Sequence, residues 1–131
     1  MASIRKEIAT TAKPQEVWAA LREIGALHTR LVPGFVTDTK LEPGARIVTF
    51  GNGMVFRELI VAVDDNERRV AWSAISERLS HHNASAQVFP EAGGGSKVVW
   101  IADLLPDEAA TDISAMMELG MAAMKTTLDK L

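Results

Sequence analysis

The stretch that decides the fold is the C-terminal segment 105–131, LPDEAATDISAMMELGMAAMKTTLDKL. Pro106 suits the first turn of a helix, and Asp107 and Glu108 stand beside the positive end of the helix dipole. Apolar residues then recur with helical spacing: Ile113, Met116, Met117, Gly120, Met121, Met124, Leu128 and Leu131. The segment predicts a terminal helix of about 25 residues, against a globular mean of about 11–12.

Upstream of this segment the chain reads as strands separated by tight turns. Glu42-Pro43-Gly44 fits a type II turn, and Asn52-Gly53 is a hairpin signal. Strands are predicted near 36–41, 45–50, 54–63, 68–75, 80–89 and 97–105, and the alternation from Ile4 to Thr10 adds a seventh. Because the connections are short, neighbouring strands should be antiparallel. Between the first two strands, Pro14–Ile24 is predicted as a helix and Ala26–Leu31 as a second short one.

Bulk properties limit the function classes. A chain of 131 residues with net charge −3 predicts one domain over 1–131 and no nucleic-acid partner. The absence of cysteine excludes disulfides and thiolate chemistry, and three histidines make a metal site improbable. No segment has the length of a membrane span, and the first residues lack a signal peptide's apolar core, so a cytoplasmic protein without a cofactor is expected.

The order of these elements resembles that of the START-like superfamily, also called SRPBCC. The resemblance rests on Lys13-Pro14-Gln15-Glu16-Val17-Trp18, Pro33-Gly34, Glu58-Leu59 followed by Asp64-Asp65, and Trp100 leading to Leu104-Leu105-Pro106. It implies an α+β fold in which a seven-stranded curved antiparallel sheet grips the long C-terminal helix, with one or two short helices after the first strand. It also implies a cavity for an apolar or amphipathic small molecule. The chain looks most similar to the polyketide cyclase/dehydrase-type members.

The stretch 80–89, SHHNASAQVF, supplies the first candidate site residue. Successive side chains of a strand point to opposite faces, so His81 and His82 cannot both reach one ion. His82 shares its face with Ala84 and Ala86, whose small side chains would leave room above the sheet. We therefore expect His82 and Ala84 to face the cavity and His81 to face solvent.

Glu58 is the second candidate. The spacing from Glu58-Leu59 to Asp64-Asp65 resembles the corresponding strand and turn of abscisic-acid receptors, which belong to the same superfamily, and this resemblance implies that Glu58 lines the pocket. The same face would carry Phe56 and Ile60, and burial between them would raise the pKa of the carboxyl group. The alternative is that Glu58 forms an ordinary ion pair with an arginine at the sheet rim.

Three further elements contribute candidate ligand contacts. Trp72 shares a face with small residues and fits either a pocket floor or ordinary core. The register of 97–105 stays open: either Trp100, Ala102 and Leu104 face inward, or Asp103 does and could pair with His82. On the terminal helix, Met117, Met121 and Met124 are soft enough to adapt to a ligand, and His28 would lie over the cavity mouth.

Three functions are compatible with these residues. The first is a carrier or binding protein for a small hydrophobic or amphipathic molecule. The second is a cyclase, dehydratase or isomerase in which His82 or Glu58 acts as general base. The third is a partner-binding or homodimeric module without a ligand.

Overall fold

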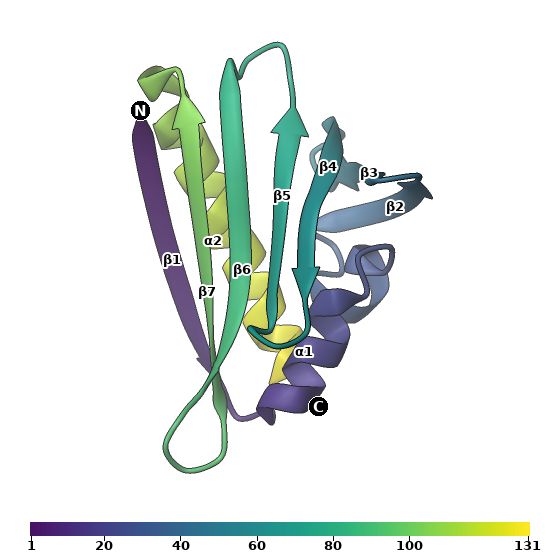
Figure 1. Ribbon diagram of the computed structural model, residues 1–131, viewed down its shortest axis with the longest axis vertical. Helices are drawn as coiled ribbons and strands as arrows, with labels where there is room; N and C mark the ends of the chain where they lie inside the picture. Colours follow the sequence, from purple (N-terminus) through teal and green to yellow (C-terminus); the bar gives the residue numbers. More distant parts are fainter.

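The computed structural model describes all 131 residues, arranged as a seven-stranded antiparallel sheet with its helices on one face (Figure 1). The strands are β1 (Ala2–Thr10), β2 (Val36–Glu42), β3 (Ala45–Phe50), β4 (Val55–Asp64), β5 (Arg69–Ile75), β6 (His81–Pro90) and β7 (Ser96–Leu105). Their order is β1-β7-β6-β5-β4-β3-β2, so the first strand pairs with the last. The predicted α+β fold with a curved seven-stranded sheet is confirmed.

The helices also follow the predicted order. They are α1 (Pro14–Arg22), a π-helical turn η1 (Leu27–Leu31), a 3-10 turn η2 (Asp107–Ala109) and α2 (Ala110–Leu128). With 19 residues, α2 is shorter than predicted. The α-helical part begins only after the 3-10 turn, and Leu131 is exposed beyond the last residue of α2.

The alternation of side chains in the strands creates an inner face, which packs on the helices. On β6 the side chains of Ala84, Ala86 and Val88 are buried, whereas His81 and Asn83 are exposed. On β7 the buried inner residues are Val98, Ala102 and Leu104. Of the two alternatives for this strand, the one in which Trp100, Ala102 and Leu104 face inward is therefore correct.

The helix α2 is fastened to the sheet along one flank. Lys125 Nζ donates to the backbone oxygen of Ala9 at 2.6 Å, and Lys6 Nζ lies 2.8 Å from Glu118 Oε1. At the end of the helix, the Thr10 hydroxyl donates to Asp129 Oδ1 at 2.6 Å. These contacts tie α2 to β1, and α2 also lies against η1.

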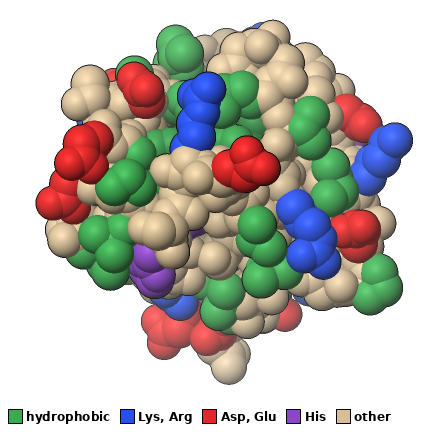
Figure 2. Space-filling model, turned by 90° about the horizontal axis from the view of Figure 1, so that it is seen from above, with side chains coloured by type: hydrophobic (Ala, Val, Ile, Leu, Met, Phe, Trp, Pro, Cys, Tyr) green, Lys and Arg blue, Asp and Glu red, His purple; other side chains and the backbone are tan.

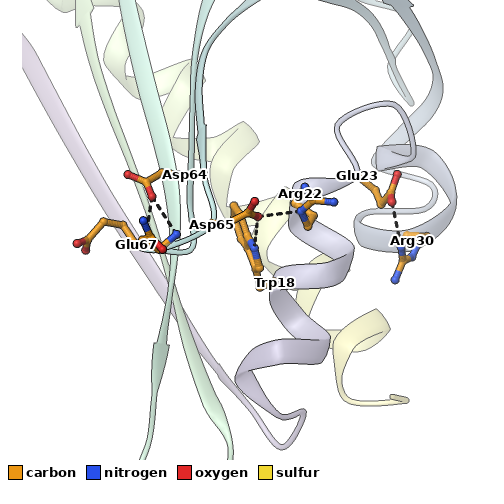
Figure 3. A network of polar contacts seen from close by, with 8 residues as sticks. Trp18, Arg22, Glu23, Arg30, Asp64, Asp65 and Glu67 are labelled. Atoms are coloured by element: carbon orange, nitrogen blue, oxygen red, sulfur yellow. Dashed lines mark hydrogen bonds and ion pairs between the residues drawn. The ribbon is translucent and has the colours of Figure 1, made fainter.

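The helix α1 is held by the turn between β4 and β5 (Figure 3). Trp18 Nε1 and Arg22 Nε both donate to Asp65 Oδ1, at 2.9 and 3.0 Å. The hydrogen bond from Arg22, followed by that from Trp18, holds the pKa of Asp65 below its ordinary value. The preceding Asp64 accepts from two backbone N–H groups of the same turn, which fixes its shape.

The surface mixes charge and apolar groups. Viewed from the end that is uppermost in Figure 1, acidic and basic side chains are scattered among apolar ones (Figure 2). Neither helix combines the length and apolarity needed to cross a bilayer.

Candidate ligand-binding site

Two pockets remain between the inner face of the sheet and the helices. The first, which we call the Arg46 pocket, has a volume of about 60 Å³ and is lined by residues of α1, η1, all the strands except β1, and α2. The second, the His82 pocket, has a volume of about 40 Å³ and lies toward the start of α2. Small-molecule sites usually measure roughly 300–1,000 Å³. The interior is thus far more completely filled than the resemblance implies.

Five residues line both pockets and form the partition between them: Phe35, Phe50, Glu58, Trp72 and Trp100. The rings of Phe35 and Phe50 meet edge to face, with centroids 5.3 Å apart. Those of Trp72 and Trp100 lie 6.2 Å apart at a tilt of 49°. Four aromatic side chains and one carboxylate therefore separate the two hollows.

The carboxylate of Glu58 forms a buried ion pair with Arg46. These residues are cross-strand neighbours on β3 and β4, and Arg46 Nε donates to Glu58 Oε1 at 2.8 Å. The two side chains are only 4% and 8% exposed. Arg46 also donates from Nη1 to the backbone oxygen of Ile24 at 3.2 Å, and its guanidinium lies over the Trp72 ring at 5.3 Å. The arginine partner expected at the rim is instead inside the fold.

Burial raises the pKa of Glu58 above its ordinary value, and Arg46 offsets only part of this effect. Removing a carboxylate from water disfavours its charged form, whereas a guanidinium at hydrogen-bond distance favours it. The pair thus places a carboxyl group of altered basicity against both pockets.

His82 is half-buried and lines the His82 pocket at the point where β5 and β6 separate. The backbone pairing of these strands ends at Trp72 and Ala84. Beyond it, the backbone N–H of Ala74 donates to His82 Nδ1 at 2.9 Å. Burial, with a smaller contribution from His81, lowers the pKa of His82. A neutral ring that accepts at Nδ1 carries its proton on Nε2.

A third hollow adjoins both pockets from outside. This Leu119 groove, of about 360 Å³, is lined by Gly34, Phe35, Phe50, Gly51, Asn52, Met116, Leu119 and Ala123. Phe35 and Phe50 also line both interior pockets. Phe35 lies against α2 because Gly120 has no side chain; a Cβ there would be 2.9 Å from Phe35 Cε2. The rings of Phe35 and Phe50 are therefore what separates the interior from the groove.

Most of the predicted site residues lie in the interior. Six line a pocket: Phe56, Glu58, Trp72, His82, Met117 and Met124. Ile60, Ala84 and Met121 pack in or against the core and line neither pocket. The functional roles of these nine residues remain predictions.

Two predicted ligand contacts lie elsewhere. Asp103 belongs to the outer face, opposite Ser3 and Asn83 of the flanking strands, because the neighbouring Ala102 and Leu104 point inward. The alternative in which Asp103 faces the interior is therefore wrong. Asp103 and His82 do line one open hollow of about 500 Å³ at the ends of β5 and β6, and the role of Asp103 as a ligand contact remains a prediction. His28 lines neither pocket. Its Nδ1 lies 3.2 Å from the hydroxyl oxygen of Thr39 on β2.

Arg46, Phe35 and Phe50 were not predicted as site residues. A signal for Arg46 is present in ARIVTF (45–50), where alternation places it on the same face as Val48 and Phe50. A charged residue in register with two buried apolar ones has to find a partner inside. Phe35 follows the turn at Pro33-Gly34, where no periodicity indicates direction.

Comparison with known proteins places the chain in a family. Its sequence matches the model of the family "polyketide cyclase / dehydrase and lipid transport" over residues 1–131. No curated protein matches it. The protein XoxI from Bacillus cereus is 19% identical, with TM-score 0.87 over 98% of this chain and 96% of that one.

Two structures of named proteins share the fold at greater distance. The di-domain ARO/CYC protein BexL, from the BE-7585A biosynthetic pathway, is 14% identical, with TM-score 0.83 over 98% of this chain and 47% of that one. Norcoclaurine synthase from Thalictrum flavum is 19% identical, with TM-score 0.73 over 98% and 92%. With its whole length matched by the family model, the chain belongs to the polyketide cyclase/dehydrase and lipid transport family.

Proposed function

We propose that this protein binds a small apolar or amphipathic molecule between the sheet and α2, as a binding or carrier protein. The observation that carries the proposal is the partition of aromatic rings around the Arg46–Glu58 pair, which lines both interior pockets and adjoins the Leu119 groove. A buried ion pair beside unfilled space is not what stability alone would favour, because replacing such a pair by apolar residues of similar volume often leaves a protein at least as stable.

Binding requires the pockets to widen. The side chains best suited to this are the methionines of α2, because an unbranched thioether chain repacks at low cost. Met116 and Met117 line the His82 pocket, and Met124 lines the Arg46 pocket. Rotation of Phe35 would join both pockets to the groove, and we assign the entrance to this point.

The test is to fill a pocket without touching its polar groups. Ala86, buried on β6, lines the Arg46 pocket, and Ala86→Leu adds three carbons there. Isopropylbenzene is titrated into the ¹⁵N-labelled protein, and backbone amide shifts are followed by NMR. We expect saturable shifts around the pockets in the wild type and their loss in Ala86→Leu.

The matched control is Ala122→Leu, the same change at an exposed position on α2. It should bind isopropylbenzene like the wild type, and circular dichroism checks that both variants fold. If Ala86→Leu does not fold, Ala74→Leu fills the His82 pocket instead. Shifts that are absent, or that persist unchanged in the filled variant, would refute interior binding.

Catalysis is the second candidate function, and the observation that favours it is the altered basicity of Glu58. A carboxyl group with raised pKa, lining both pockets, suits general acid–base chemistry. His82 is less suited to act as a base, because its Nδ1 lone pair already accepts from Ala74. Once a reacting ligand is known, Glu58→Gln should abolish turnover and leave binding within a few-fold. Equal loss of both would assign Glu58 to binding alone.

A further inference from the structure

The indole N–H of Trp100 is the one buried side-chain nitrogen or oxygen atom to which the protein offers no hydrogen-bond partner. Another indole shows the contrast, since Trp18 Nε1 donates to Asp65 at 2.9 Å. Leaving a buried donor unpaired costs free energy, because the N–H group has given up its hydrogen bond to water without gaining another. A group that accepts from Trp100 would recover this free energy.

The Trp100 ring lies where a ligand would be. It lines both interior pockets, between the Trp72 ring and α2. A Cβ at Gly120 would lie 2.8 Å from its Cζ3 atom, so the ring packs directly on the helix backbone. Across the strand pair its neighbour is Ala86, whose small side chain lines the Arg46 pocket. The ring is thus packed on two sides and next to space that a small molecule could take.

The other polar groups around the pockets are already engaged and nearly balanced in charge. Arg46 donates to Glu58 and to the backbone oxygen of Ile24, and His82 accepts from Ala74. A ligand carboxylate would add a second negative charge beside Glu58 in a site of low polarity, which is costly. A neutral oxygen acceptor meets the free donor without that cost.

We infer that the interior ligand is a neutral, mainly apolar molecule with a hydrogen-bond acceptor oxygen, of the ketone or ester class, and that Trp100 Nε1 donates to this oxygen. The inference rests on the proposed binding function and names the chemical class that the site prefers. Trp100 is accordingly the residue that orients the ligand and discriminates it from a hydrocarbon of the same shape.

The experiment compares acetophenone with isopropylbenzene, two molecules of equal heavy-atom count that differ in the carbonyl oxygen. Both are titrated into the ¹⁵N-labelled full chain and into Trp100→Phe, which keeps an aromatic ring and removes the N–H. The chain has three tryptophans, so the wild type gives three indole signals, and the one absent from Trp100→Phe belongs to Trp100. The Trp18 signal serves as an internal control, because its N–H is bound to Asp65.

We expect acetophenone, and not isopropylbenzene, to move the Trp100 indole proton downfield and to slow its exchange with water. Trp100→Phe should weaken acetophenone binding about tenfold more than isopropylbenzene binding, the effect of one hydrogen bond to a buried donor. If Trp100→Phe does not fold, Trp18→Phe and Trp72→Phe assign the signals, and the wild-type shift decides alone.

Two outcomes overturn the inference, and they differ in what they say of the proposed function. In the first outcome, both molecules bind, both shift the Trp100 indole proton alike, and Trp100→Phe lowers the affinity for both by the same factor. The proposed binding function is then supported, and the preference for an acceptor oxygen is wrong. A buried water molecule that keeps its place on Trp100 would give this result. If neither molecule binds the wild type, the proposed function and the inference fall together.

Discussion

Replacing Arg46 by methionine should destabilise the protein strongly, because it leaves Glu58 buried without a counter-charge. The two side chains are 4% and 8% exposed and joined at 2.8 Å, which places them among fully buried pairs. Breaking such a pair costs about 3–5 kcal/mol. The lost hydrogen bond to the Ile24 backbone puts the expected cost toward the upper end. For a small protein this lowers the urea midpoint by roughly 1.5–2.5 M.

The assay is equilibrium unfolding in urea of four proteins: wild type, Arg46→Met, Glu58→Leu and the double variant. The double variant should lie within about 1 kcal/mol of the wild type, since an apolar pair of similar volume removes the desolvation cost of both charges. The matched control is Arg57→Met, because Arg57 pairs with Glu42 at 3.0 Å but both side chains are over two-fifths exposed. That variant should lose less than about 1 kcal/mol.

The free energy of unfolding of the wild type and of Arg46→Met should also depend on pH in a predictable direction. Burial raises the pKa of Glu58 in the folded state, so between its unfolded and folded pKa values the folded state binds more protons than the unfolded state. The free energy of unfolding then falls as pH rises through that window. Arg46→Met should steepen this fall, because the pKa-lowering effect of Arg46 is gone. A single variant that loses less than 1 kcal/mol, or a double variant that loses the sum of both, would refute the reasoning.

Three further outcomes are expected. His82 has a lowered pKa in the folded state, so stability should decline as pH falls below about 6.5; His82→Asn, whose side-chain oxygen can still accept from Ala74, should abolish that decline in urea titrations. Gly120→Ala should lower thermal stability, because the clash with Trp100 and Phe35 costs about 1–3 kcal/mol and outweighs a gain in helix propensity of about 1 kcal/mol; an unchanged melting temperature would contradict the packing argument. Phe35→Ala should speed association of isopropylbenzene at least severalfold in NMR line-shape measurements, and an unchanged rate would place the entrance elsewhere.

The order of the elements was predictable because most of them carry a local periodic or turn signal, whereas the grip of the sheet on the terminal helix was what the family resemblance implied. The stripe on α2 and the turns at Pro43-Gly44 and Asn52-Gly53 depend on neighbouring residues alone, and no long-range information was needed to place them. The face of β6 that packs inward was equally clear, because Ser85 and Gln87 on one face are polar whereas Ala84 and Ala86 on the other are apolar.

The register of β7 was not predictable for a physical reason. Trp100 and Ala102 alternate with Val99 and Ile101, which are just as apolar. Because the two faces of β7 do not differ in polarity, the sequence does not show which of them packs on the helices. Asp103 was misplaced in one alternative for this reason.

The site itself was predictable only in part. Glu58 could be placed on the inner face, but its partner is fixed by the register of β3 against β4, which the sequence does not specify. The size of the pockets depends on sheet curvature and helix tilt, and both arise from packing over the whole molecule. Residues outside regular strands and helices, such as Phe35, carry no periodic signal at all.

The attachment of α2 to β1 has a consequence for how such a protein can diversify. The contacts made by Lys6, Lys125 and Asp129 secure one side of the helix without involving any residue of the two interior pockets. Substitutions on the opposite side can then reshape the interior while the helix keeps its position. Descendants of one ancestor could in this way exchange one small molecule for another without having to evolve a new scaffold.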